Sequence, residues 1–133
     1  MAVAPQAVPT AQAGAGAAMR AAILALRDAA DACLAAGRNG DIAGQLVANR
    51  RFHDRLHGLA GSRPLSRLID LLWDSTEAYR ALYYTLEDET AATDRAHRAI
   101  LDAVARGDTD AAIELQDAHR NRALERLHAA LVA

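Results

Sequence analysis

Three histidines and an asparagine have the residue types and spacing expected of a metal site. His53, His97 and His119 fall on the apolar faces of three different predicted helices, and Asn49 precedes His53 by four residues. A buried imidazole needs a hydrogen-bond partner or a metal ion, because burying an unpartnered polar group is costly. A single inward histidine is an ordinary core residue. Three together favour a shared partner, and a metal ion is the commonest partner of clustered imidazoles.

The spacing around a predicted turn places two of these histidines at nearly the same level. His97 lies ten residues before Gly107, and His119 lies twelve residues after it. In an antiparallel hairpin with a rise of about 1.5 Å per residue, these are heights of roughly 15 and 18 Å above the turn. Asn49 and His53 leave one helix face within a single turn, as a chelating pair must. Their position relative to the hairpin stays open, because the helix between them has an unknown tilt.

Helical periodicity and capping residues predict an all-α fold, an antiparallel bundle of about five helices. The helices are expected at about 17–36, 42–60, 64–83, 91–106 and 109–133, with Asp41 capping the second and Asp108 or Thr109 capping the fifth. The third helix is expected to be mostly buried, and the fifth is expected to direct Leu127 and Leu131 inward. The connections are short, which favours antiparallel neighbours and an up-and-down arrangement.

Length and composition support one soluble domain. The chain has 133 residues, of which 52% are hydrophobic, and much of this fraction is Ala and Leu, as in closely packed helices. Residues 1–18 are rich in Ala, Pro and Gly and predict a flexible tail, which leaves residues 19–133 as the domain. The net charge of −2 provides no basic field for a phosphate backbone, so direct DNA binding by this chain is not expected.

Cysteine usage and hydropathy indicate the compartment. Cys33 is the only cysteine, so an intramolecular disulfide is excluded, and a reducing cytoplasm is the simplest location. We expect this residue to be a small buried apolar side chain on the first helix. No stretch approaches 18 uninterrupted apolar residues, so no membrane span is expected.

The segments that carry the histidines resemble a known family. The run Asn49-Arg-Arg-Phe-His53, the segment AHRAILDAVARGD at 96–108 and the later His119 look like the FCD domain, the effector-binding half of one branch of the GntR transcriptional regulators. The family pattern is an Asp or Asn three residues before a Phe-His pair, a His opening an Ile-Leu helix that ends in Gly-Asp, and a last His on the next helix. The resemblance covers about residues 19–133.

The resemblance implies a ligand set, an effector class and an assembly. Asn49, His53, His97 and His119 are expected to bind one divalent ion, with Zn²⁺ first and Ni, Fe or Mn as alternatives. A small carboxylate effector is expected to occupy the remaining coordination positions, and the protein is expected to be a homodimer. The implied use is metal-dependent sensing in transcription regulation.

The sequence departs from the family pattern at several points. Asn49 stands where most metal-binding members have Asp, Ser62 stands where a loop Asn is usual, and Ala96 replaces a frequent Glu. The first departure lowers the expected metal affinity. Family members also carry a winged helix-turn-helix domain ahead of the sensor, and the usual first helix of the sensor is missing. The chain is therefore expected to be a fragment of a regulator or a standalone sensor-like protein.

Candidate effector-binding residues lie on the third predicted helix. Arg80 can clamp a carboxylate bidentately, although an exposed arginine beside Glu77 is an equal alternative. Trp73, Tyr79 and Tyr83 are expected in the core, at an interface or lining the pocket, the tyrosines by a hydroxyl group.

The other titratable residues near the site are expected to lie outside the set of metal ligands. His57 is expected at the rim rather than on the metal, and His128 is expected to face solvent. Asp94, three residues before His97, either orients that ring or acts as an acid in the first turn of its helix.

Two functional classes fit these residues. A ligand-sensing module leads. A metalloenzyme acting on a small organic acid is the alternative, because three imidazoles and one weak oxygen ligand leave open coordination positions. No general base stands at a motif-like spacing from the histidines, which favours the sensor.

Overall fold

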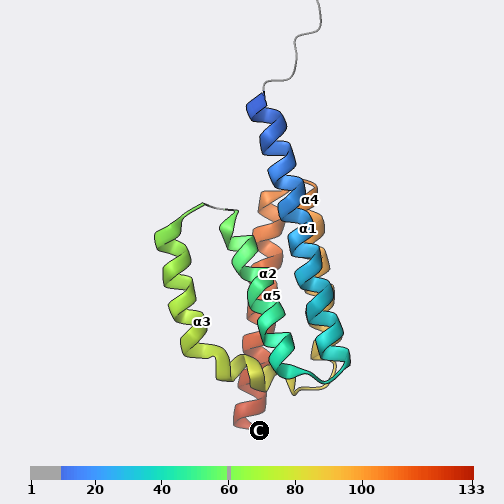
Figure 1. The fold of residues 1–133 in the computed structure, drawn as a ribbon. Helices are drawn as coiled ribbons and strands as arrows, with labels where there is room; N and C mark the ends of the chain where they lie inside the picture. The colour runs from blue at the N-terminus through green and yellow to red at the C-terminus, as the bar shows by residue number, and fades with distance from the viewer. Residues whose placement is uncertain (1–9, 60) are drawn as a thin grey trace, which may run out of the picture.

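The described part of the chain, residues 10–59 and 61–133 of a computed structural model, contains five helices and no strand (Figure 1). Helices that follow each other in the sequence run in opposite directions in Figure 1, as the predicted antiparallel bundle requires. The all-α prediction is therefore confirmed. The helices are α1 (Thr10–Arg38), α2 (Ile42–Gly58), α3 (Arg63–Tyr84), α4 (Glu89–Ala105) and α5 (Thr109–Val132).

Short polar side chains set the beginnings of α2 and α5. The Asp41 side chain accepts a hydrogen bond of 2.9 Å from the backbone N–H of Gly44, and the Asp108 side chain accepts one of 3.0 Å from Ala111. These bonds satisfy donors that a helix N-terminus leaves free. Gly107, at a φ of 71°, makes the turn between α4 and α5, because only glycine adopts this conformation without steric cost. The turn thus fixes the hairpin that carries two of the histidines.

The hydrophobic core lies between α1, α2 and α4. Its members are Leu26, Ala29, Ala30, Phe52, Ile100 and Leu101. Leu26, Phe52 and Ile100 are completely buried, and the two alanines of α1 allow its neighbours to approach closely. Cys33 is buried on α1, as predicted. This three-helix core is the rigid part of the fold on which the site is built.

The prediction that α3 is mostly buried is wrong. Only Tyr83 and Tyr84 are buried on this helix, whereas Leu65, Leu68 and Leu72 are 48%, 55% and 58% exposed. Figure 1 shows α3 displaced to one side of the other helices over its N-terminal half. Apolar periodicity reports that a helix has an apolar face, but does not report what covers that face.

The expected inward stripe of α5 is also only partly packed. No residue of α5 is fully buried; Leu115 packs against the core, while Leu131 is 58% exposed. The predicted burial of Leu131 is therefore wrong. The first half of α5 belongs to the bundle, and its second half presents leucines to a cavity described below.

The N-terminal boundary differs from the expectation as well. Helix α1 begins at Thr10, so residues 10–18, which were expected in the flexible tail, are helical. The rest of the predicted tail, residues 1–9, lies outside the described residues. Among the helices that the structure describes, none combines the length and apolarity needed to cross a membrane.

Candidate metal centre

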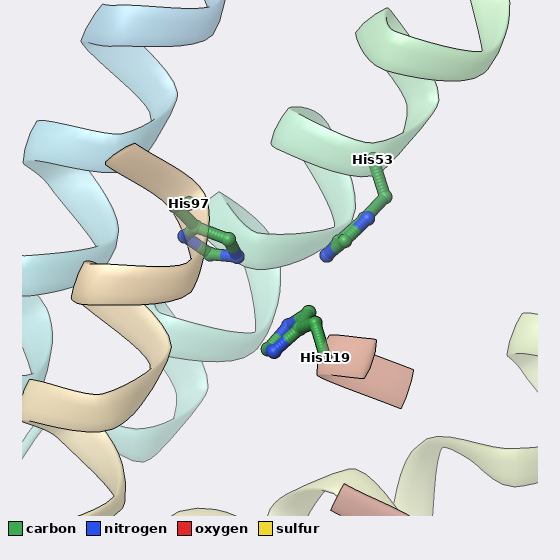
Figure 2. A group of neighbouring side chains, drawn as sticks. All are labelled: His53, His97 and His119. Carbon is green, nitrogen blue, oxygen red and sulfur yellow. The ribbon is translucent and has the colours of Figure 1, made fainter. Parts of the chain in front are cut away.

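The three predicted histidines converge from three helices (Figure 2). His53 on α2, His97 on α4 and His119 on α5 each offer a ligand atom, and these atoms all lie within 4.8 Å of one another. The ring centroids of His97 and His119 are 5.4 Å apart, so the two rings are close in space as the equal heights above the turn predict. His53 and His97 are 6% and 0% exposed. Sequence spacing alone did not place α2, and the structure brings its histidine to the other two.

Asn49 lies directly beside this group. Its Oδ1 atom is 3.0 Å from Nε2 of His97, and its side chain is 4% exposed. In the metal-free protein this contact is a hydrogen bond from the ring N–H to the amide oxygen. An ion with bonds of about 2.1 Å at right angles also places neighbouring donors about 3.0 Å apart. The Asn49–His97 pair therefore already has the spacing of two ligands on one ion.

Burial keeps the three imidazoles neutral. It lowers the pKa of His97 to about 3, with smaller contributions from His119 and Arg98. Burial, followed by the neighbouring His97 and His119, holds the pKa of His53 well below the ordinary value, and burial is also the main cause of the lowered pKa of His119. Neutral imidazole is the form that binds a metal ion. At neutral pH each ring therefore has one nitrogen lone pair without loss of a proton, and Nε2 of His97 becomes a donor to a metal ion once the ring proton shifts to Nδ1.

The surrounding side chains orient two of the rings. Phe52 stacks on His97 with ring centroids 4.2 Å apart and an interplanar angle of 21°, and Trp73 lies 5.4 Å from the ring of His53. The Nδ1 atom of His97 is buried without a hydrogen-bond partner. Asp94 instead accepts a hydrogen bond of 3.1 Å from Arg98, so the predicted role of Asp94 in orienting His97 is not seen.

The donor set fits a first-row divalent ion after a small contraction. A tetrahedral ion with bonds of about 2.1 Å places its nitrogen ligands about 3.4 Å apart, which is closer than the 4.8 Å limit that encloses these donors. His119 has the most freedom to move inward, because no residue of its helix is fully buried. Nitrogen donors with one amide oxygen suit zinc, nickel, iron or manganese better than magnesium or calcium. The residues present therefore fit the metal that the family resemblance implies.

A cavity of about 580 Å³ opens beside the histidines between α3 and α5. This volume lies within the usual range for small-molecule sites. Asn49 and His53 of α2 and His119 of α5 line it. The four predicted effector-binding residues, Trp73, Tyr79, Arg80 and Tyr83, all line it from α3.

Arg80 is a half-buried cation on the cavity wall. Its guanidinium group lies over the ring of Trp73, 3.9 Å from the ring centroid, and donates hydrogen bonds to Thr76 Oγ1 at 2.7 Å and to the carbonyl oxygen of Trp73. Burial lowers its pKa, partly offset by the charge of Glu77. No acidic side chain in the described residues forms a salt bridge with it. The exposed alternative beside Glu77 is therefore not what the structure shows.

Two tyrosines that line the cavity, Tyr79 and Tyr83, differ in exposure and in the hydrogen-bond partners of their hydroxyl groups. Tyr83 is 4% exposed, and its hydroxyl group contacts Thr93 at 3.3 Å and accepts a hydrogen bond of 3.2 Å from Arg122. Tyr79 is 53% exposed and lies at the open side of the cavity. Tyr79 is thus free to contact a ligand, whereas the hydroxyl group of Tyr83 already has protein partners.

The two histidines that were not assigned as ligands lie at the edge of the site. His57 is half-buried and accepts a hydrogen bond of 2.9 Å from Gln116, with its ring centroid 6.2 Å from that of His53. His128 is exposed on the outer wall of the cavity, as the solvent-facing prediction expects. Sequence reasoning missed Gln116 and the leucines Leu124 and Leu127 as wall residues, because their helical spacing is also typical of a core.

Fold and site together define a ligand-binding helical domain in which convergent imidazoles face a cavity. The FCD domain family matches residues 1–122, which is most of the chain. The chain belongs to this family, whose members are the effector-binding domains of GntR-type transcriptional regulators. Searches of curated proteins and of solved structures found no match.

Proposed function

We propose that this domain is a metal-dependent sensor of small carboxylates for a GntR-type regulator. The observation that carries the proposal is the convergence of three neutral histidines, two of which, His53 and His119, line a cavity that Arg80 also lines. A carboxylate is the ligand that suits both a divalent ion and a guanidinium group. The homodimer and the cytoplasmic location expected from the family resemblance belong to this proposal.

Different residues are proposed to bind the metal ion and the carboxylate. Asn49, His53, His97 and His119 would hold the ion, Zn²⁺ first, and the ion would supply a Lewis-acidic position for a carboxylate oxygen. The stacking of Phe52 on His97 keeps that ring in place. Arg80 is already fixed by Trp73 and Thr76, so little side-chain entropy is lost when it pairs with a ligand.

The placement of the ligand groups suggests how binding is transmitted. The proposed metal ligands are on α2, α4 and α5, whereas Arg80 is on α3, on which only Tyr83 and Tyr84 are buried. A carboxylate that contacts both the ion and Arg80 would draw α3 toward α5. The ligand would therefore favour a closed arrangement by its differential contacts with the two states.

The metalloenzyme alternative receives less support from the cavity wall. As far as the structure describes the cavity, no acidic side chain lines it. A hydrolytic metal site commonly uses a carboxylate as general base, within hydrogen-bond reach of the bound water. Sensing is therefore the function that the geometry supports better.

Calorimetry on zinc-loaded protein tests the proposal. Acetate is expected to bind and acetamide is not, and removal of the metal by a chelator is expected to abolish the acetate signal. Arg80→Met is expected to weaken acetate by roughly tenfold or more without loss of zinc, since a charge-assisted hydrogen bond contributes about 1.5–3 kcal/mol. Arg67→Met, an exposed arginine on the same helix, is the matched control. Equal binding of acetate and acetamide, or acetate binding that persists without metal, would contradict the proposed function.

A further inference from the structure

The polar groups that are proposed to bind a carboxylate lie together in one part of the cavity. Asn49, His53, His119 and Arg80 form this part, and Gln116 joins it from the adjacent turn of α5. A small acid such as acetate would fill only this part. The remaining wall must therefore contact either solvent or another portion of the ligand.

The wall beyond this part is mainly apolar. On α5 it consists of Ala123, Leu124, Leu127 and Leu131, with the polar side chains of Arg120 and His128 among them, and Tyr79 contributes from α3. At a rise of about 1.5 Å per residue, Leu127 and Leu131 lie roughly 12 and 18 Å along the helix from His119. The apolar strip therefore begins next to the histidines and leads away from them.

These side chains are exposed in the protein without ligand. Leu124, Leu131 and Tyr79 are 57%, 58% and 53% exposed. Large apolar side chains that line a concave surface commonly mark a binding site, because covering them removes apolar area from water. Their exposure within one cavity sets them apart from scattered surface leucines.

The second half of α5 is nevertheless held firmly. Arg126 donates a hydrogen bond of 2.8 Å to the buried carboxylate of Glu89, and Arg122 pairs with the same carboxylate. Glu89 is 1% exposed and begins α4. These pairs tie α5 to α4 through its arginines, so the leucine side of α5 is kept in place without being covered by the core.

We propose that the ligand of this cavity is a monocarboxylate with an extended apolar tail, an alkyl or aryl acid. The inference rests on the proposed function for the carboxylate end. The head lies at the histidines and Arg80, and the tail lies along Leu124, Leu127 and Leu131. The proposed ion and Arg80 at one end and the mainly apolar wall beyond match an amphipathic acid better than a dicarboxylate, whose second charge would lie against leucine.

A chain-length series measures the tail contribution. Zinc-loaded protein is titrated with acetate, butyrate, hexanoate and octanoate, and binding is followed by calorimetry and by the fluorescence of Trp73, the only tryptophan, which lines the cavity. Burial of each methylene group contributes up to about fourfold in affinity, so each step of two carbons is expected to strengthen binding roughly four- to sixteenfold. Constant affinity along the series would overturn the inference.

Exposed leucines allow the wall to be altered without disturbing the core. Leu124→Gln is expected to weaken octanoate by roughly fivefold or more while leaving acetate and zinc binding unchanged. Leu131, roughly 18 Å along the helix from His119, lies beyond the end of an octanoate chain, so Leu131→Gln is tested with dodecanoate and is expected to weaken that longer acid. Ile113→Gln is the matched control, because Ile113 is 54% exposed on the same helix and does not line the cavity. Equal octanoate affinities in the Leu124 and Ile113 variants would overturn the inference.

The outcomes separate this inference from the function on which it rests. If the protein binds neither zinc nor acetate, the proposed function itself is contradicted. If it binds zinc and acetate but binds octanoate no more tightly than acetate, only the proposal of an apolar tail is contradicted. If octanamide binds as tightly as octanoate, the carboxylate part of the ligand is wrong. The apolar wall could instead be covered by a second copy of the chain, and sedimentation of Leu131→Gln tests this. A dimer that dissociates in this variant, together with equal affinities for all acids of the series, would assign the wall to a dimer interface and overturn the inference.

Discussion

Replacement of Asn49 by aspartate is expected to strengthen metal retention and weaken carboxylate binding. With asparagine, the proposed ligands are four neutral groups, so a divalent ion keeps its full charge to attract an anion. The Oδ1 atom of Asn49 lies 3.0 Å from Nε2 of His97, beside the histidine group. An aspartate there is a stronger oxygen donor and removes part of the field that a carboxylate ligand experiences.

The size of the effect follows from the geometry. Two oxygens bound to one ion lie about 3–4 Å apart, where the repulsion between unit charges is about 1 kcal/mol in water and about 4 kcal/mol at an effective dielectric constant of 20. The cavity is open to solvent at Tyr79 and Leu131, so a value toward the lower end applies. We expect a loss of about 1–2 kcal/mol in carboxylate binding, which is roughly five- to thirtyfold in affinity.

Calorimetry with acetate on both proteins, each fully loaded with the same ion, measures this loss. Competition with a chelator measures metal retention. Asn121→Asp adds the same charge on the exposed side of α5 and is expected to change neither quantity appreciably. Equal or tighter acetate binding by Asn49→Asp would show that the charge of the ion does not set the affinity, and would refute the reasoning.

Three further outcomes are expected. Glu89→Gln should lower the free energy of unfolding by roughly 2–3 kcal/mol in urea titrations, because the 1% exposed carboxylate loses its charge-assisted hydrogen bonds from Arg122 and Arg126. Glu114→Gln, at an exposed position, should have little effect. Metal-free protein should lose stability as the pH falls from about 6.5 toward about 3, because the folded state keeps His97 neutral while the unfolded chain binds a proton there. Urea titrations that give the same free energy of unfolding at several pH values in this range would contradict this. The chain alone should give no sequence-specific complex in a gel shift, since its net charge is −2, and a discrete complex at moderate salt would contradict this.

The sequence predicted most of the helices and the composition of the histidine group. Glycines at the turns and capping aspartates such as Asp41 and Asp108 act within a few residues, so they are visible in a local pattern. The pairing of His97 and His119 could be anticipated from one hairpin, because only the number of residues on each side of Gly107 was needed. The approach of His53 depends on packing between α1, α2 and α4, and spacing along the chain does not determine that packing.

The surroundings of the cavity were harder to predict. The leucines of α3 and of the second half of α5 repeat at helical spacing, and this pattern is the same whether the face contacts a core or a cavity. Glu89 falls between the third and fourth predicted helices, yet it begins α4 and is buried, because Arg122 and Arg126 reach it from 33 and 37 residues away. Arg80 was equally compatible with solvent exposure, and only its stacking on Trp73 places it at the cavity.

The metal content of the purified protein tests the central claim most directly. Elemental analysis and native mass spectrometry are expected to find about one first-row divalent ion per chain, to lose it in His53→Ala, and to retain it in His128→Ala, whose histidine is exposed on the outer wall. Absence of such an ion, with no thermal stabilisation on adding zinc, or equal metal content in the His53 and His128 variants, would contradict the account.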